Sequence, residues 1–184
     1  LDFPCLVAPR ACQRLAHPQG EAALALAAAA QGAGFVLSCQ TSCPAQEVAC
    51  APFWFQLYLQ RDPALTDQLA QVAVNAGARA FVVTIDAPLN GVRNQEIAAG
   101  FHLPVGVRPV MLDALVASSR PNTAEDGIPE LMAQAPDWAA LAEFCARSPL
   151  PVLAKGILSP RSAKAARQAG CAGAIVSNHG GRVL

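Results

Sequence analysis

A histidine and an arginine lie three positions apart near the end of the sequence. His179 and Arg182 flank Gly180 and Gly181 and follow the apolar run Ala174–Val176. Two glycines let the backbone turn tightly or approach a ligand closely. An imidazole base beside a fixed guanidinium suits a substrate that carries a carboxylate next to its reacting carbon. A turn histidine beside a solvated arginine would have the same spacing, so the motif alone leaves both interpretations open.

A carboxylate that could assist His179 comes at the end of another apolar run. Asp86 follows Thr84-Ile85 and precedes Ala87-Pro88. As a partner of the imidazole it would stabilise the imidazolium. In isolation, an aspartate just before a proline segment is more typical of a turn.

Further polar side chains stand within or just after apolar runs. Lys155 follows Val152–Ala154, a setting too apolar for a routine surface lysine, so its ammonium either extends to solvent along apolar surface or faces an anionic cofactor. Arg93 could supply a second guanidinium from the segment after Asp86. The other candidates of this kind are Ser38, Gln56, Tyr58, Thr84, Ser177 and Asn178.

The elements that must position these residues alternate along the chain. Continuous apolar runs predict parallel strands covered on both faces, at 5–8, 35–38, 53–59, 80–85, 152–155 and 174–177. Helical spacing predicts helices at 21–31, 64–76, 138–146 and 161–169. Asp62 and Ser159, each before a proline, are typical helix caps, and Gly32, Gly77 and Gly170 mark helix ends.

Strand and helix repeat at intervals of roughly 20–30 residues, which indicates βαβ units. The turn after the first run reads Ala8-Pro9-Arg10-Ala11-Cys12, so the glycine fingerprint of a dinucleotide-binding sheet is absent. A (β/α) barrel fits better, because its reactive side chains stand at the carboxyl ends of the strands. The proline-rich interval 87–136 predicts a long loop excursion from this barrel.

Composition narrows the class of protein. Thirteen basic residues balance thirteen acidic ones, which argues against a nucleic-acid partner, and a hydrophobic content of 53% argues against disorder. No apolar stretch reaches the ~20 residues of a membrane helix. Seven scattered cysteines without Cys-x-x-Cys spacing predict free thiols in a reducing compartment and no metal site. We expect a cytoplasmic protein, with membrane association or organelle targeting of a full-length form left open.

The sequence resembles the FMN-dependent α-hydroxy-acid oxidase and dehydrogenase family, which includes glycolate oxidase, lactate oxidase and mandelate dehydrogenase. The resemblance runs nearly end to end and is strongest in the block Ile175–Arg182, the family's active-site signature. The other blocks are Ala8-Pro9 with Gln13–Pro18, Leu37-Ser38, Phe55–Tyr58, Thr84–Pro88 and Leu150–Gly156.

The resemblance implies a role for each candidate. His179 would be the active-site base and Asp86 its charge partner. Arg93 and Arg182 would hold the substrate carboxylate, and Tyr58 would donate a hydrogen bond to the substrate. The cofactor-binding residues would be Lys155 near the flavin pyrimidine, Ser38, Gln56 and Thr84 on the ring, and Ala8, Pro9, Arg10 and Ala11 alongside it.

The reaction that the resemblance implies is oxidation of a small L-2-hydroxy acid to the 2-oxo acid. FMN would accept the electrons, because no protein side chain accepts a hydride. Oxygen, a quinone or a cytochrome would then reoxidise the flavin, and a full-length form would be a homo-oligomer. Ala11 stands where some relatives that handle oxygen differently have glycine, which favours an oxidase.

Length sets the extent of the fold that we expect. A (β/α)8 TIM barrel takes about 250 residues, so 184 residues predict one domain truncated to about the first six β/α units. The first residue, Leu1, suggests a cut start, and the last two strands with the FMN phosphate site are expected to be missing. Two alternatives stay open: a non-catalytic barrel remnant, and another FMN barrel such as type 2 isopentenyl-diphosphate isomerase. The pairing of Arg93 with Arg182 favours a carboxylate substrate over the latter.

Overall fold

Six parallel strands form half of a (β/α) barrel. The computed structural model describes residues 2–87, 94–116 and 135–181. Within that part each strand pairs with the next one along the chain, in the order β1-β2-β3-β4-β5-β6. This sequential order is the one found in a (β/α) barrel. The strands are β1 (Leu6–Val7), β2 (Gly34–Ser38), β3 (Trp54–Leu57), β4 (Phe81–Thr84), β5 (Val152–Ile157) and β6 (Gly173–Val176).

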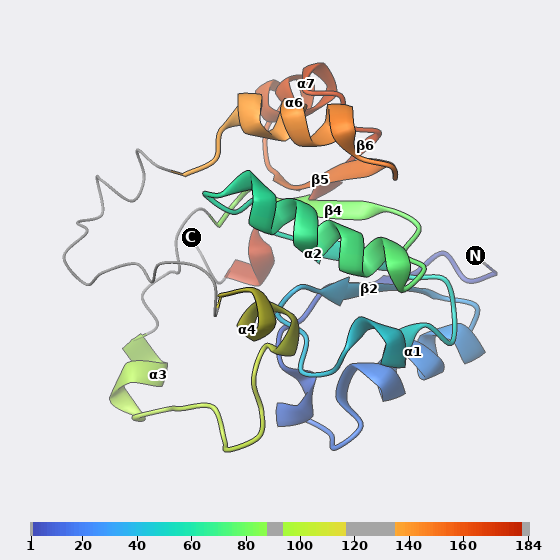
Figure 1. Ribbon diagram of the computed structural model, residues 1–184, viewed down its shortest axis with the longest axis vertical. Coiled ribbons are helices and arrows are strands. Elements are labelled where there is room, and N and C mark those ends of the chain that lie inside the picture. Colours follow the sequence, from blue (N-terminus) through green and yellow to red (C-terminus); the bar gives the residue numbers. More distant parts are fainter. Residues whose placement is uncertain (1, 88–93, 117–134, 182–184) are drawn as a thin grey trace.

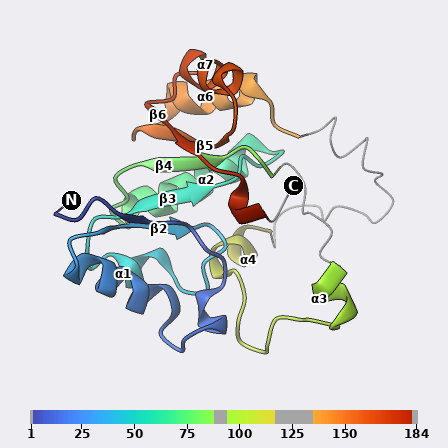
Figure 2. The ribbon, with the colours of Figure 1, turned by 180° about the vertical axis from the view of Figure 1, so that it is seen from behind.

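The helices between the strands cover the outer face of the sheet. Helix α2 lies in front of the strands in Figure 1 and behind them in Figure 2, where the opposite face of the sheet is turned to the viewer. Helices α6 and α7 lie together beside β5 and β6. The four longer helices are α1 (Gly20–Ala30), α2 (Pro63–Asn75), α6 (Trp138–Arg147) and α7 (Pro160–Gln168). The predicted helices and strands are therefore confirmed, with ends shifted by a few residues.

Local sequence signals account for the helix ends. The Asp62 carboxylate accepts a hydrogen bond from the Ala64 amide at 2.9 Å, and the Ser159 hydroxyl accepts one from the Ser162 amide at 3.1 Å. Each cap stands directly before the proline that opens its helix. Gly77 and Gly170 both have a φ of 91°, the left-handed geometry that closes the last turn. The predicted caps and stops are confirmed.

Alternation along the strands separates the core from the inner face of the half-barrel. Phe35, Leu37, Phe55, Phe81 and Val83 pack in one cluster with residues of α1, α2 and α6. Phe81 and Phe144 of α6 meet edge to face, with ring centroids 5.6 Å apart. Because neighbouring residues of a strand point to opposite faces, Ser38, Gln56 and Thr84 lie on the inner face.

The interval 87–136 contains short helical segments. Helices α3 (Asn94–Ala98) and α4 (Val110–Val116) lie within it, while residues 88–93 and 117–134 are outside the described part. The Val110 amide donates to the Thr41 carbonyl at 3.0 Å, and Met111 joins the core. The start of α4 is therefore anchored to the segment after β2. The extent of the excursion and of the domain stays a prediction.

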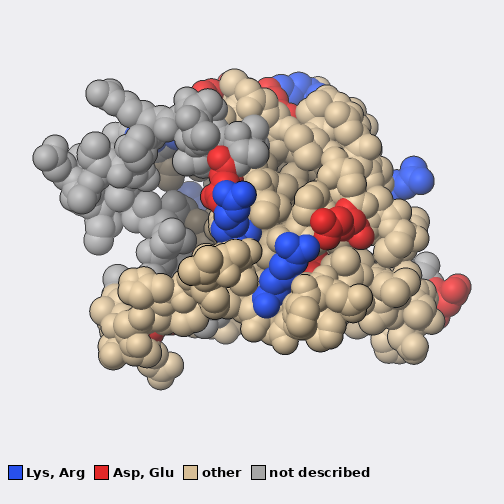
Figure 3. Space-filling view, turned by 60° about the horizontal axis from the view of Figure 1, so that its bottom comes forward, with Lys and Arg blue, Asp and Glu red and all other residues tan. Residues whose placement is uncertain are grey.

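The surface carries few charges. Most of the face turned forward in Figure 3 is uncharged, in keeping with a charged content of 14%. Ion pairs such as Arg147 to Asp67, at 2.8 Å, join exposed side chains, and pairs of this kind contribute under about 1 kcal/mol each. In the described part of the chain, none of the helices is both long enough and apolar enough to cross a membrane.

Candidate active site

Three buried polar side chains form a continuous chain across the carboxyl ends of β2, β3 and β4. The Ser38 hydroxyl donates to Oε1 of Gln56 at 3.1 Å, and Nε2 of Gln56 donates to the Thr84 hydroxyl at 3.0 Å. All three residues are under 10% exposed. These bonds orient both ends of the Gln56 amide, so the inner face of the barrel presents fixed polar groups.

A buried ammonium continues this row on β5. Lys155 pairs in register with Thr84, which places both side chains on the same face of the sheet. The residue is 9% exposed, and within the described part of the chain its ammonium has no hydrogen bond and no ion pair. A buried cation without a counter-ion is costly, so this position suits an anionic or electron-rich ligand.

Asp86 and His179 meet although 93 positions separate them in the sequence. Asp86 follows β4, His179 follows β6, and Nδ1 of His179 lies 2.8 Å from Oδ1 of Asp86. In Figure 2 the dark red turn after β6 lies close to the end of β4. Asp86 and His179 are therefore in contact at one end of the half-barrel, as the sequence predicted.

Backbone geometry holds both members of this pair. His179 has a φ of 59°, and its amide donates to the Ser177 hydroxyl at 3.0 Å. Asp86 rests against Gly156, whose φ is 108°; a Cβ there would lie 2.6 Å from two atoms of the Asp86 side chain. The register between β5 and β6 shifts at this glycine. The bulge thus lets the backbone of β5 approach Asp86 closely.

The pair leaves two groups open for chemistry. With Nδ1 of His179 facing the carboxylate, Nε2 is the nitrogen that can accept a proton. Oδ2 of Asp86 is buried and has no hydrogen-bond partner in the described structure. The side chain of Asp86 is 8% exposed and that of His179 is 25% exposed. The imidazole is therefore the accessible member, supported by a buried carboxylate.

The segment after β1 reaches the same rim. Ala8, Arg10 and Ala11 are exposed and Pro9 is half-buried. Cys12 ends this segment with a φ of 46°, and its amide donates to the Gln40 carbonyl at 2.9 Å. The short stretch is thus tied to the loop after β2 while its own surface stays open.

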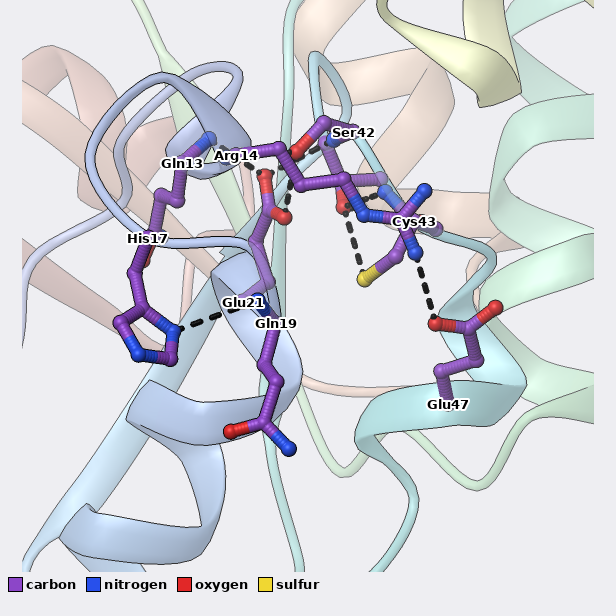
Figure 4. A network of polar contacts seen from close by, with 9 residues as sticks. Gln13, Arg14, His17, Gln19, Glu21, Ser42, Cys43 and Glu47 are labelled. Carbon is purple, nitrogen blue, oxygen red and sulfur yellow. Dashed lines mark hydrogen bonds and ion pairs between the residues drawn. The ribbon is translucent and has the colours of Figure 1, made fainter. Parts of the chain in front are cut away.

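A second buried carboxylate, that of Glu21, links the segment after β1 to the loop after β2. Figure 4 shows Glu21 between Gln13, at the start of the short 3-10 helix Gln13–Leu15, and Ser42. Its carboxylate accepts bonds from the Gln13 amide at 3.0 Å, the Ser42 amide at 2.8 Å and the Ser42 hydroxyl at 2.7 Å. Burial opposes ionisation of Glu21, but these donors outweigh it and lower its pKa below 4.5. Glu21 is therefore an ionised structural anchor.

The structure brings most of the predicted site residues together, but not all of them can be placed. Ser38, Gln56, Thr84, Lys155, Asp86 and His179 lie on β2 to β6 or directly after them. Tyr58 is half-buried after β3. Arg93 and Arg182 lie outside the described residues. In the described chain there is also no cluster of three potential metal ligands.

Two residues of the site had no role assigned from the sequence. A lone glycine within an apolar strand signals a bulge or a close approach, and Gly156 carried that signal. Ser177 was a candidate only as a polar strand end, whereas its hydroxyl fixes the turn that presents His179.

These groups fit the flavin that the resemblance implied. The row Ser38–Gln56–Thr84 offers oriented hydrogen-bonding groups to a planar heterocycle, and the unpaired Lys155 ammonium offers positive charge at one edge. The open segment Ala8–Ala11 provides a surface on which a ring can lie.

Comparison with known proteins is consistent with this geometry. The family model described as FMN-dependent dehydrogenase matches residues 1–184. An L-lactate oxidase of Roseobacter sp. (strain GAI101) is 52% identical over 189 residues, covering 98% of this chain and 50% of that protein. A 4-hydroxymandelate oxidase of Amycolatopsis orientalis is 39% identical, covering 99% and 52%. The chain thus spans about half the length of the curated relatives it matches.

A solved structure shows the same likeness in three dimensions. Mandelate oxidase with (S)-4-hydroxymandelic acid superposes with a TM-score of 0.84 at 37% identity, covering 99% of this chain and 53% of that one. The half-barrel described above is therefore shared with that enzyme. Sequence, fold and family model agree that the chain belongs to the FMN-dependent dehydrogenase family.

Proposed function

We propose that the protein is an FMN-dependent oxidase of a small L-2-hydroxy acid, with L-lactate as the first substrate to test. The observation that carries this proposal is the contact of 2.8 Å between His179 and Asp86 beside the unpaired Lys155. The relative from Roseobacter, at 52% identity, is named L-lactate oxidase, which supports lactate in particular.

His179 serves as the base. Oxidation of a 2-hydroxy acid to a 2-oxo acid removes two protons and two electrons, so a proton acceptor must touch the substrate. Nε2 of His179 takes a proton, because Nδ1 already faces Asp86. The carboxylate of Asp86 stabilises the imidazolium that forms and fixes its orientation. A base positioned in this way contributes about 10²–10⁴-fold in rate.

Two guanidinium groups and a phenol complete the substrate site in this proposal. Arg93 and Arg182 hold the substrate carboxylate, which the fork geometry of arginine suits. Tyr58 donates a hydrogen bond to the substrate. The support for these roles is the resemblance to the family: Arg182 lies in the signature block 175–182, Arg93 lies in the segment after Asp86, and Tyr58 directly follows β3.

The cofactor site lies next to the base. Ser38, Gln56 and Thr84 would hold the flavin ring, Lys155 would offer it positive charge, and residues 8–11 would provide a surface beside it. Bound FMN supplies the acceptor for the two electrons that leave the substrate. A positive charge at Lys155 favours that acceptance by offsetting the negative charge that develops.

Oxygen is the electron acceptor that we favour over a quinone or a cytochrome. The support is that relatives are named oxidases and that Ala11 stands where glycine occurs in family members that handle oxygen differently. The same names favour oxidation over isopentenyl-diphosphate isomerisation. A cytoplasmic location and a homo-oligomeric full-length form are part of the proposal.

The test uses the full-length protein. We expect purified protein to carry flavin absorbance through gel filtration and to reduce oxygen when L-lactate is added. The variant His179→Gln should retain the flavin spectrum but lose steady-state turnover by at least about 10²-fold. A protein that binds no FMN would support the non-catalytic remnant instead. Undiminished turnover by His179→Gln would exclude His179 as the base.

A further inference from the structure

Two thiols from neighbouring β/α units touch at the end of the half-barrel opposite the candidate active site. Cys145 lies in the last turns of α6, and Cys171 lies between α7 and β6. Their sulfur atoms are 3.8 Å apart. All seven cysteines are described, and among them this is the one pair of thiols in mutual contact.

The backbone next to Cys171 comes close to Cys145. Gly170, next to Cys171, has a φ of 91°, and a Cβ built on it would lie 3.4 Å from Cβ of Cys145. The turn before β6 therefore packs directly against the Cys145 side chain. Both cysteines are half-buried, so solvent reaches them. A disulfide requires the two sulfur atoms to close from 3.8 Å to ~2.05 Å.

We propose that Cys145 and Cys171 form an oxidation site in which hydrogen peroxide converts the two thiols to a disulfide. Peroxide is the product when oxygen accepts two electrons and two protons, so the source of this oxidant rests on the proposed oxidase function. The site itself rests on the contact between the two sulfurs.

The reaction balances with one peroxide for each pair of thiols. One thiolate attacks a peroxide oxygen, the O–O bond breaks, hydroxide leaves and the sulfur becomes a sulfenic acid. The second thiolate attacks that sulfur, the S–O bond breaks, hydroxide leaves and the S–S bond forms. The two thiol protons neutralise the two hydroxides. Two thiols and one peroxide thus give one disulfide and two waters.

The local environment decides which sulfur reacts first and at what pace. Burial raises the pKa of Cys145, but a hydrogen bond from Cys171 favours the Cys145 thiolate. Burial and the neighbouring Cys145 raise the pKa of Cys171 to about 12. Cys145 is therefore the first nucleophile. Since little thiolate exists at neutral pH, the pair responds to sustained exposure to peroxide, and its rate rises with pH.

The bond would join α6 to the turn that precedes β6. It ties the end of α6 to the start of β6, at the amino ends of the strands, where a barrel is tuned for stability rather than chemistry. Closing a loop between residues 26 positions apart should raise the midpoint of thermal unfolding by about 5 °C. The rim with His179 is left unchanged.

The first experiment treats the full-length protein, purified under reductant, with excess hydrogen peroxide at about pH 8.5. After the free thiols are alkylated, peptide mass spectrometry should find Cys145 joined to Cys171 with the loss of two hydrogens. Dithiothreitol should reverse both the link and the rise in unfolding temperature. Exposed Cys5 and Cys50 show in the same sample that the oxidant has acted.

Variants separate the pair from general oxidation. Cys145→Ser and Cys171→Ser should each abolish the link and the thermal shift, whereas the matched control Cys50→Ser should retain both. Separate oxidation of Cys145 and Cys171 to sulfinic acids, or unreacted thiols there once Cys5 and Cys50 are modified, would overturn the proposal.

A second arm tests the source of the oxidant. The enzyme supplied with L-lactate and oxygen should form the same link, and catalase should prevent it. A link that forms with added peroxide but not during exposure to lactate supports the thiol site and overturns the oxidase as its source. Failure of the thiol site and failure of the oxidase proposal thus give different results.

Discussion

Glu21 and Asp86 are both buried carboxylates near the same end of the half-barrel, but their surroundings differ. The oxygens of Glu21 accept three hydrogen bonds from Gln13 and Ser42. Asp86 contacts His179 through one oxygen, and its buried Oδ2 has no partner in the described structure. Native structures rarely leave buried polar atoms unpaired. Glu21 is thus fully bonded and fixes the chain, whereas Asp86 combines an open oxygen with a contact to the more exposed imidazole of His179.

Two cations near these carboxylates, Arg14 and Lys155, also differ in whether they form an ion pair. Arg14 pairs with Glu47 at 3.2 Å on the surface, while the more deeply buried Lys155 forms no ion pair within the described chain. Charge that is buried and uncompensated requires a reason outside the protein itself. Oδ2 of Asp86, after β4, and the ammonium of Lys155, on the adjacent strand β5, are the groups left without a partner in the described structure, and this is where the flavin and substrate are proposed to bind.

The largest effect should come from Asp86→Asn in the full-length, FMN-loaded protein. An amide cannot stabilise the imidazolium, so we expect kcat/KM for L-lactate to fall by about 10²–10⁴-fold. The free energy of unfolding should change by under about 1 kcal/mol, because the open Oδ2 contributes no bond. Steady-state kinetics and urea denaturation measure the two. Asp67→Asn, at an exposed ion pair, is the control and should leave kinetics unchanged; retention of full activity by Asp86→Asn would refute its role.

Gly156→Ala tests whether the bulge in β5 positions Asp86. A methyl group there meets Asp86 at 2.6 Å and also requires a φ of 108°, so we expect a loss of about 3 kcal/mol in unfolding free energy and lower activity. Gly77→Ala is the matched control, because Gly77 has a φ of 91° but nothing within 4 Å of the added carbon. It should cost about 1 kcal/mol from backbone strain alone. Equal losses in the two variants would show that the approach to Asp86 is unimportant.

Glu21→Gln should mainly lower stability, whereas Asp86→Asn should mainly lower activity. An amide nitrogen would face backbone donors, so we expect unfolding free energy to fall by about 2 kcal/mol. Urea denaturation followed by circular dichroism checks this. The exposed Glu47→Gln should cost under about 1 kcal/mol. If Glu21→Gln proves as mild as Glu47→Gln, the hydrogen-bond network does not hold the two loops together.

The smallest effect is a dependence on pH. Because the pKa of folded Glu21 lies below 4.5, its ionised form stabilises the fold at higher pH. That contribution is present above the unfolded pKa and is lost as pH falls through the folded pKa. The difference in unfolding free energy between the natural protein and Glu21→Gln should therefore narrow below about pH 4.5. A difference that stays constant down to pH 3 would contradict an ionised anchor.

Much of the fold follows from local sequence. The apolar runs locate all six strands, and the caps Asp62 and Ser159 locate two helix starts. These signals act over a few residues, so they can be read in order. Gly156 shows what local sequence does not reveal. A glycine within an apolar strand indicates a bulge, but Asp86, the neighbour that requires this glycine, is 70 positions away.

The candidate site shows the same division. His179 and the two-glycine turn were apparent as a motif, because they are adjacent in the sequence. Nothing next to Glu21 in the sequence marks it as an anchor, because its donors come from other segments. The contact between Cys145 and Cys171 was equally hidden, since cysteine spacing carries no information about which thiols meet.

The sequence by itself determined the order of the strands, the residues at their carboxyl ends and the family to which they belong. Only the tertiary structure decided which polar groups pair and which stay open. The reason is physical: a strand forms from its own alternation and propensity, but the satisfaction of a buried polar atom depends on neighbours that parallel strands bring from distant parts of the chain. Asp86 and His179, 93 positions apart, became a pair in that way.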